Sequence, residues 1–224
     1  MSYSFNGSTD YITCGTSNLS TGVYTVAAWI KPTGLTGNHT ILTQQDTWDT
    51  ANKFDVLQAN DALMATQAAV YDFLIPTTRL STSAWNLIVV AVDGTNAKGY
   101  IGTSSNVATS TADLLADSGS GSTIRIGMVG TSTDPFAGKI AEVAVWSTKL
   151  GTTDIDLLAA GDNPATVSPG SLVEYWRLYD NATSNSGTRN GTVTGATADS
   201  ADHPAVDAPA GGGSTFVPQV IMVL

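Results

Sequence analysis

The segment from Phe136 to Leu158 joins a long apolar strand pattern to a short helix pattern, and it constrains the fold more than any other stretch. From Ile140 the residues alternate, with Ile140, Glu142, Ala144 and Trp146 on one expected face and Ala141, Val143 and Val145 on the other. Both faces are largely apolar. We therefore expect the strand to be covered on both sides.

A short helix is expected directly after this strand. Thr153 carries a hydroxyl that can cap a helix, and Asp156 follows three residues later in the spacing of a capping box. Ile155, Leu157 and Leu158 give the helix an apolar side, and Gly161 marks its end. One strand followed by one small helix is a specific signal in an otherwise β-rich sequence.

Four segments, in order, resemble the laminin-G-like family of concanavalin A-type jelly rolls. Residues 3–14 are similar to its opening strand of the type L-x-F-D-G-x-D-D-Y-V, and residues 24–32 to its T-I-S-A-W-V-K-P strand. Residues 85–102 are similar to its W-H-H-V-A-x-V-x-D-G hairpin, and residues 136–158 to its strand-to-helix segment. The resemblance implies an all-β, two-sheet antiparallel jelly-roll sandwich with one short helix near 153–160, of the type found in bacteriophage structural proteins.

The resemblance also guides the reading of weaker segments. Residues 60–71 have helical propensity, but they lie between strands of the family pattern and are interpreted as strand. A strand at 171–180 and the segment 185–195 resemble pieces that come first in the commonest members of the family. A closed sandwich tolerates such reordering because its termini lie close together. Residues 1–206 are therefore predicted to form one permuted jelly-roll domain.

Composition excludes several classes of function. With 9 Lys and Arg against 19 Asp and Glu, the formal net charge is −10, which argues against nucleic acid as a partner. No apolar run reaches the roughly 18 residues that cross a bilayer, so no membrane span is expected. Cys14 is the single cysteine, which excludes an internal disulfide, and we interpret it as a small buried hydrophobic residue.

The C-terminal residues read as an addition to the sandwich. Residues 207–213 have the Gly/Pro-rich composition of a linker, and residues 214–224 form an apolar, β-prone segment. We interpret 214–224 as an assembly arm that adds to a sheet edge of another copy or of a capsid or tail protein. Its expected contact residues are Phe216, Val217, Val220, Ile221, Met222, Val223 and Leu224. The alternative is that the arm folds back as the last strand of its own sandwich.

No catalytic residues are predicted. Paired carboxylates are needed for glycoside hydrolysis, and the E-x-D-x-x-E strand motif of β-glucanases is absent. Glu142 and Glu174 are the only glutamates and fall on separate strands, so both are interpreted as structural, with Glu174 more open to a functional role. His39 and His203 are interpreted as solvated loop residues.

Binding residues are sought in polar loops. Asp46, Trp48 and Asp49 lie in a wholly polar stretch, which predicts a weak rim site for sugar or calcium, with Trp48 as the stacking ring. Solvated acidic loops and a loop-packing Trp48 are the alternatives, and no other cofactor is expected. The other four tryptophans lie in strand patterns and are assigned to the core: Trp29, Trp85, Trp146 and Trp176.

Three hypotheses of function follow from these observations. The first is a non-enzymatic virion structural protein, a capsid decoration protein or a tail or fibre component, made in the host cytoplasm because no signal peptide is found. The second is a carbohydrate-binding adhesion module that binds surface glycans. The third is a glycan hydrolase with an atypical site.

Overall fold

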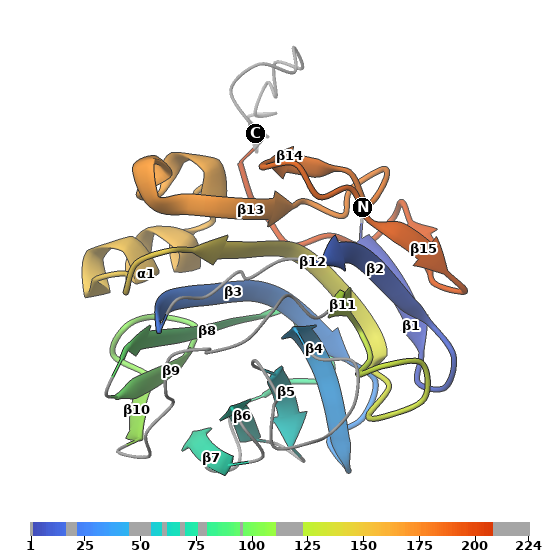
Figure 1. The fold of residues 1–224 in the computed structure, drawn as a ribbon, viewed down its shortest axis with the longest axis horizontal. Coiled ribbons are helices and arrows are strands. Elements are labelled where there is room, and N and C mark those ends of the chain that lie inside the picture. Colours follow the sequence, from blue (N-terminus) through green and yellow to red (C-terminus); the bar gives the residue numbers. More distant parts are fainter. Residues whose placement is uncertain are drawn as a thin grey trace, which may run out of the picture.

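Two antiparallel sheets stack face to face in the computed structural model, which describes residues 2–16, 22–44, 55–59, 62–67, 70–75, 80–94, 96–110 and 123–207 (Figure 1). Within these residues one sheet has nine strands and the other seven. The predicted all-β sandwich with one short α-helix is confirmed.

The nine-stranded sheet follows the order β10-β9-β8-β3-β12-β1-β16, with β13 also paired to β12 and β14 to β13. Its strands are β1 (Ser2–Asn6), β3 (Val23–Pro32), β8 (Asn86–Asp93), β9 (Ala97–Ile101), β10 (Val107–Ser110), β12 (Ala137–Trp146), β13 (Leu172–Trp176), β14 (Ser184–Ser186) and β16 (Thr197–Asp199). The segments after the helix, expected to be displaced pieces of the jelly roll, thus supply strands to this sheet.

The seven-stranded sheet follows the order β15-β2-β11-β4-β5-β6-β7. Its strands are β2 (Tyr11–Thr16), β4 (Asn38–Gln44), β5 (Asp55–Ala59), β6 (Ala62–Gln67), β7 (Val70–Ile75), β11 (Thr123–Ile126) and β15 (Thr192–Thr194). Strand β6 and the first two residues of β7 lie within the segment 60–71, which confirms that strand structure overrides its helical propensity.

The helix α1 (Thr152–Ala160) is followed by two short 3₁₀ turns, η1 (Pro164–Thr166) and η2 (Pro169–Ser171). The predicted cap at Thr153 is wrong, because Gly151 is the N-cap residue and its N–H donates to Asp154 Oδ2 at 3.3 Å. Asp156 instead accepts from the N–H and the hydroxyl of Ser104, which ties the helix to the β9–β10 connection. The predicted end is confirmed, with Gly161 in the left-handed conformation at φ 99°.

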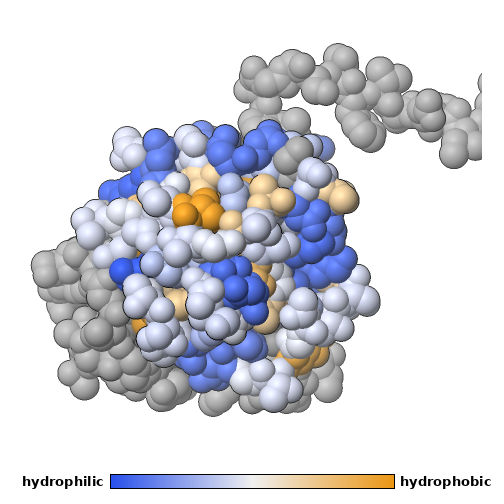
Figure 2. All heavy atoms as spheres, turned by 90° about the vertical axis from the view of Figure 1, so that its right-hand side faces the viewer, coloured by the Kyte–Doolittle hydropathy of each residue, from blue (hydrophilic) through white to orange (hydrophobic). Residues whose placement is uncertain are grey.

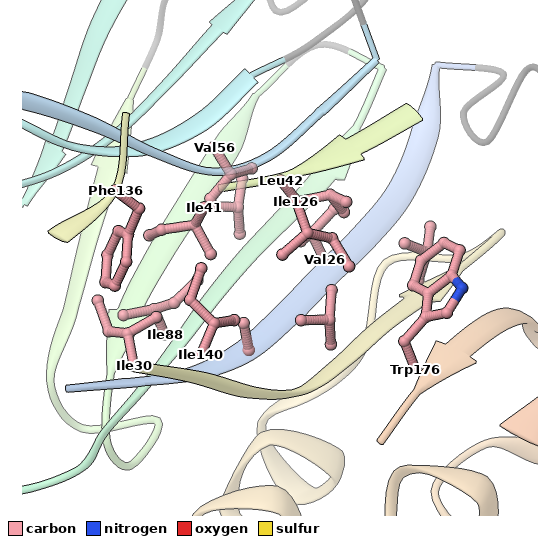
Figure 3. Close-up of a cluster of buried hydrophobic side chains, with 14 of the residues drawn as sticks. Val26, Ile30, Ile41, Leu42, Val56, Ile88, Ile126, Phe136, Ile140 and Trp176 are labelled. Carbon is pink, nitrogen blue, oxygen red and sulfur yellow. The ribbon is translucent and has the colours of Figure 1, made fainter. Parts of the chain in front are cut away.

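The main core lies between the two sheets (Figure 3). Val26, Ile30, Ile88 and Ile140 come from the nine-stranded sheet and face Ile41, Leu42, Val56 and Ile126 of the other sheet. Full burial of one such side chain stabilises the fold by about 1.5–3 kcal/mol. The inward-facing apolar residues of both sheets together form this interior.

A second core covers the outer face of the nine-stranded sheet, as expected for a strand that is apolar on both sides. Ala144, Trp146 and Tyr175 pack there with Ile155 and Leu158 of α1. Leu157, expected on the apolar side of the helix, is instead 41% exposed, because Ile155 and Leu158 are the residues that face the sheet.

The expected alternation along β12 is wrong in one respect. Ile140 shares the main core with Val143 and Val145, whereas Ala144 and Trp146 belong to the second core. A β-bulge between Ala141 and Ala144 interrupts the alternation of side chains between the two faces of β12. Glu142 lies in this bulge and adopts φ 54°. The bulge lies where the edge of β12 passes from its pairing with β1 to its pairing with β13.

Candidate functional site

The site predicted from the sequence at Asp46, Trp48 and Asp49 lies outside the described residues, as do the arm residues 214–224. The strand ends that flank the first of these segments are described. Strand β4 ends at Gln44, β5 begins at Asp55, and Thr43 is paired with Asp55 across the two strands. The predicted loop site therefore starts and ends beside this cross-strand pair.

Five residues on three adjacent strands form a polar patch on the outer face of the seven-stranded sheet. They are Tyr11 and Thr13 of β2, Arg125 of β11, and Thr192 and Thr194 of β15. Thr13 is opposite both Thr192 and Arg125, and Tyr11 is opposite Thr194. Directly opposed residues have Cβ atoms about 4.5–5.5 Å apart, so the five side chains are neighbours.

The strand period explains why these residues face outward. Ile12 and Cys14 of β2 and Ile124 and Ile126 of β11 are all fully buried in the main core. Their neighbours in sequence must point to the opposite side of the sheet. Thr192 and Thr194 are exposed, and Tyr11, Thr13 and Arg125 are partly exposed.

The cross-strand row of Arg125 extends to the strand ends that flank residues 45–54. Arg125 is opposite Thr43 of β4, and Thr43 is opposite Asp55 of β5. The side chain of Thr43 is buried, so Arg125 marks the limit of the accessible patch among the side chains described in this row. The register thus places the polar patch and the flanks of residues 45–54 in one line across the sheet.

The chemistry of the patch favours a ligand rich in hydroxyl groups. Each threonine hydroxyl and the Tyr11 phenol can both donate and accept a hydrogen bond, and the Arg125 guanidinium has a planar fork of donors. The Tyr11 ring adds an apolar surface next to its polar tip. Together these groups can bind a surface on which polar hydroxyls and apolar ring faces alternate.

Glu142 lies in a buried polar cluster on the other sheet, away from this patch. Its carboxylate accepts from the Tyr175 hydroxyl and from Arg177 Nε at 3.3 Å, and His203 Nε2 lies 3.0 Å from its Oε1. Burial, together with the charge of Glu142, raises the pKa of Tyr175 well above its usual range. Tyr179 completes the cluster, with its ring edge-on to His203 and beneath the Arg177 guanidinium.

Glu174 holds a different set of partners. Its buried carboxylate accepts from the Ser184 hydroxyl at 2.7 Å, from the Thr188 N–H at 3.1 Å and from the Arg189 guanidinium. Burial, with the nearby charge of Glu174, raises the pKa of Cys14. Glu174 therefore points toward the interior of the sandwich, where it anchors the β14–β15 connection.

The two glutamates lie on opposite faces of the nine-stranded sheet. Glu174 and Tyr175 are consecutive strand residues and point to opposite sides, and Tyr175 is the residue that contacts Glu142. Glycosidases require both carboxyl groups at one bond. Glu142 and Glu174 cannot form such a pair, which agrees with their interpretation as structural residues.

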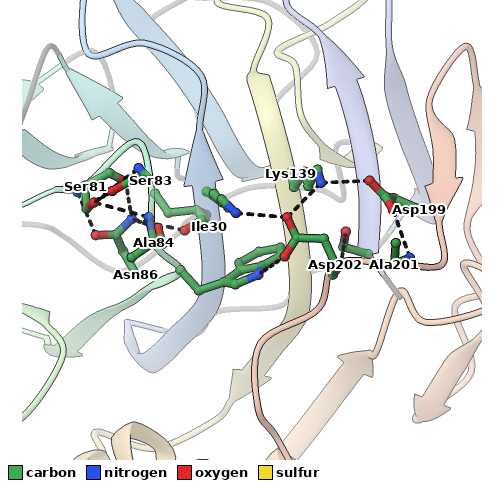
Figure 4. Close-up of polar contacts among 12 residues, drawn as sticks. Ile30, Ser81, Ser83, Ala84, Asn86, Lys139, Asp199, Ala201 and Asp202 are labelled. Carbon is green, nitrogen blue, oxygen red and sulfur yellow. Dashed lines mark hydrogen bonds and ion pairs between the residues drawn. The ribbon is translucent and has the colours of Figure 1, made fainter.

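A third polar cluster holds the C-terminal strap, which we define as residues 200–207, on the outer face of the nine-stranded sheet (Figure 4). The Asp202 carboxylate accepts from Lys31 Nζ at 3.0 Å, Lys139 Nζ at 2.7 Å and Trp85 Nε1 at 2.8 Å. Lys139 Nζ also lies 2.7 Å from Asp199 Oδ2. Hydrogen bonds from the lysines, stronger than the opposing effect of partial burial, lower the pKa of Asp202.

The tryptophan and histidine predictions are partly wrong. Trp146 and Trp176 are fully buried as predicted, and Trp29 is partly buried and packs against the second core, but Trp85 is partly exposed on the outer face. His39 is not a solvated loop residue, because it lies in β4 with its ring nitrogens 2.7 Å from Pro135 O and 2.8 Å from Thr36 O. His203 is held beside Glu142 by the strap. Both imidazoles therefore connect segments of the fold.

Within the described ranges of the chain, no group of three or more His, Cys, Asp or Glu is arranged to hold a metal ion. The same part of the chain has no helix of the length and hydrophobicity that a bilayer span requires.

The polar patch was missed in the sequence because its strands are far apart in the chain. The alternation Thr-Ile-Arg-Ile at 123–126 and Tyr-Ile-Thr-Cys at 11–14 already indicates which residues face outward. Nothing in the sequence indicates that β15 pairs with β2. The strand order, known only from the fold, brings the five residues together.

Comparison with protein families assigns most of the chain to a known family. The family Laminin_G_3, described as the concanavalin A-like lectin/glucanases superfamily, matches residues 6–156, which is more than half of the chain. The match ends within α1, so β13 to β16 lie beyond it. The comparison with curated proteins found no match.

Solved structures share the fold at low sequence identity. A candidate carbohydrate-binding protein from Bacteroides ovatus has a TM-score of 0.64 at 20% identity, covering 88% of this chain but only 59% of that protein. The CBM40 of the Ruminococcus gnavus IT-sialidase, bound to α2,3-sialyllactose, has a TM-score of 0.57 at 15% identity, covering 70% of this chain and 96% of the module. Domain 4 of the Geobacillus stearothermophilus arabinanase AbnA, in complex with arabinotriose, has a TM-score of 0.53 at 21% identity, covering 66% of this chain and 72% of that domain.

Proposed function

The chain belongs to the concanavalin A-like lectin/glucanase superfamily, and from this premise we propose that it is a non-catalytic carbohydrate-binding domain. Its glycan contacts are made by the polar patch of Tyr11, Thr13, Arg125, Thr192 and Thr194. The observation that carries the proposal is the convergence of these hydroxyl, phenol and guanidinium groups on one outer face of a lectin-like sandwich.

The surface around the patch supports this assignment. On the side of the molecule where β1, β2 and β15 lie, hydrophobic side chains form small separate spots among hydrophilic ones (Figures 1 and 2). A protein-docking surface of ordinary type has a contiguous apolar centre, which the described residues on this side do not form. Glycan binding needs only a few well-placed polar groups and one ring face.

A carbohydrate-binding domain corresponds to the second of the three functions expected from the sequence. All three structurally similar proteins described above point to glycans. One is named for carbohydrate binding, and the other two are single domains of larger enzymes that were solved with a bound glycan. The virion hypothesis rested on the resemblance to phage proteins and on the C-terminal segment, and the similar proteins described here give it no support. The hydrolase hypothesis required Glu142 and Glu174 to act on the same glycosidic bond. The two side chains lie on opposite faces of one sheet, so they cannot do so.

Binding of the purified full chain to a glycan array tests the proposal, with calorimetry on the best ligand. Arg125→Gln should lower the affinity for that ligand about tenfold, because a charged hydrogen-bond donor is lost from the patch. Lys98→Gln in β9 is the matched control, since it removes a cation from the outer face of the other sheet. An array without any bound glycan, or equal weakening by both variants, would overturn the proposal.

A further inference from the structure

We infer that the ligand of the polar patch is a neutral glycan chain of about three sugar units that lies across strands β15, β2 and β11. The inference rests on the proposed function and adds the ligand class, its orientation and its length. It follows from the spacing of the patch residues and from the net charge of the chain.

The spacing comes from the sheet itself. Neighbouring strands lie about 4.8 Å apart, so the row Thr192, Thr13 and Arg125 spans about 10 Å between its outer members. One strand spacing is close to the length of one sugar unit in an extended glycan. A chain that runs across the strands therefore meets one polar side chain at each sugar, with Tyr11 and Thr194 flanking the first two.

The row also explains why a chain is favoured over a single terminal sugar. A site for one terminal sugar gathers its polar groups around one point, as binding pockets do. The patch instead repeats a hydroxyl at Thr192 and Thr13 and a guanidinium at Arg125, one on each strand. The row ends at Thr43, whose side chain is buried, and this sets the length at about three units.

Charge favours a neutral ligand. Arg125 is the one charged residue of the patch, and its guanidinium can donate hydrogen bonds to neutral hydroxyl groups. The chain as a whole carries −10, and this field repels anionic glycans such as those that end in sialic acid. Neutral hydroxyls meet no such repulsion.

Calorimetry with two sets of ligands tests the inference on the full chain. The first set comprises neutral oligosaccharides of one to six units from the arabinan, xylan, cellulose and mannan series. The second set comprises sialyllactose and oligogalacturonates. For one neutral series we expect affinity to rise about tenfold from the monosaccharide to the trisaccharide and then to level off, with weaker binding of the acidic set.

Thr13→Val and Thr192→Val test the orientation. Each should lower the affinity for the trisaccharide and reduce the gain in affinity from the monosaccharide to the trisaccharide, because each removes one hydroxyl from one strand of the row. Thr197→Val, on exposed β16 of the other sheet, is the matched control. Thermal unfolding of all three variants verifies that they remain folded.

The outcomes separate the inference from the proposed function. Failure to bind any ligand of either set would overturn both. Preference for the acidic set, equal affinity for one and three sugars, or a rise that continues to six units would overturn the inference and leave glycan binding intact. Reduced chain-length dependence in Thr13→Val and Thr192→Val, but not in Thr197→Val, supports it.

Discussion

Three donors from neighbouring strands converge on the carboxylate of Asp202: Lys31 of β3, Lys139 of β12, and Trp85 just before β8. The hydroxyl of Ser2 in β1 also donates to the Asp202 carbonyl at 2.7 Å, so this one residue connects the strap to β1, β3, β12 and the segment before β8. The carboxylate is 26% exposed, which weakens each ion pair by solvent screening. Its hydrogen bonds remain charge-assisted.

Asp202→Asn should lower the free energy of unfolding by about 1 kcal/mol, because the side chain keeps its shape and loses its charge. Urea denaturation of the full chain measures the change. Asp180→Asn, at an exposed carboxylate, is the control and should change stability by less than about 0.5 kcal/mol. Equal effects of the two substitutions would contradict a special role for Asp202.

The same carboxylate makes stability depend on pH. The folded-state pKa values of Asp202 and Asp199 lie below the unfolded value of about 3.9, so both groups stabilise the fold above that pH. Their contribution is lost as pH falls from about 4 through the lower folded values. Denaturation between about pH 5 and pH 2 should therefore show a shallower loss of stability in Asp202→Asn than in the native protein.

Cys14 illustrates a residue whose state is readable from the sequence. Its alternation with Ile12 on a strand face predicted burial, and the thiol is fully buried. Burial and the charge of Glu174 raise its pKa, and the thiolate is the reactive form. Iodoacetamide at pH 8 should therefore leave the folded protein unmodified and label one site in urea, as mass spectrometry would show. Rapid labelling of the folded protein would contradict this.

At the scale of elements, β12 shows where pattern reading succeeds and where it fails. The long apolar run at 140–146 correctly predicted a strand covered on both faces. The faces themselves were assigned by extending a period of two through Glu142, where the chain has a bulge. This bulge separates the part of β12 that pairs with β1 from the part that pairs with β13. The apolar residues 140–146 do not indicate where one partner strand replaces the other.

Glu142→Gln tests how the bulge is maintained. A left-handed φ at a non-glycine residue costs on the order of 1–3 kcal/mol, and the contacts of the carboxylate with Arg177, Tyr175 and His203 offset it. The substitution should lower the free energy of unfolding by about 2 kcal/mol, because it leaves Arg177 without its buried counter-charge. Chemical denaturation measures the loss.

The control for this variant is Asp156→Asn on α1. Asp156 is an exposed carboxylate with two hydrogen bonds to Ser104, so its loss should cost less than about 1 kcal/mol. If Glu142→Gln is no more destabilising than Asp156→Asn, the carboxylate cluster does not hold the bulge.

At the scale of the whole molecule, the fold was far more predictable than the site. Four segments with family-like patterns predicted the sandwich, because each contains a strand or a strand-to-helix junction that is readable locally. The polar patch needs Thr192 beside Thr13, and that contact joins residues nearly 180 positions apart in the sequence. Local patterns contain no information on such pairings. The loop site at Asp46, Trp48 and Asp49 stays a prediction.

The C-terminal segments provide the contrast on which the last prediction rests. The strap is joined to the sandwich by the Asp202 cluster, by His203 beside Glu142, and by the Asp207 N–H, which donates to Gly161 O at 2.8 Å. The apolar segment 214–224 follows it and is proposed as an assembly arm. The two segments should therefore make different contributions, one to stability and the other to association.

Two truncations separate these contributions. Removal of residues 214–224 should leave the free energy of unfolding unchanged and convert self-associated protein into monomer, because the arm's apolar residues gain their burial only against another chain. Removal of residues 199–224 also deletes the strap and should lower stability by about 3 kcal/mol, since Lys31 and Lys139 lose Asp202 and Glu142 loses His203. Light scattering coupled to size-exclusion chromatography gives the mass, and urea denaturation gives the stability. A loss of stability on removing 214–224 would instead show that the arm is the last strand of its own sandwich, and unchanged association would refute the assembly role.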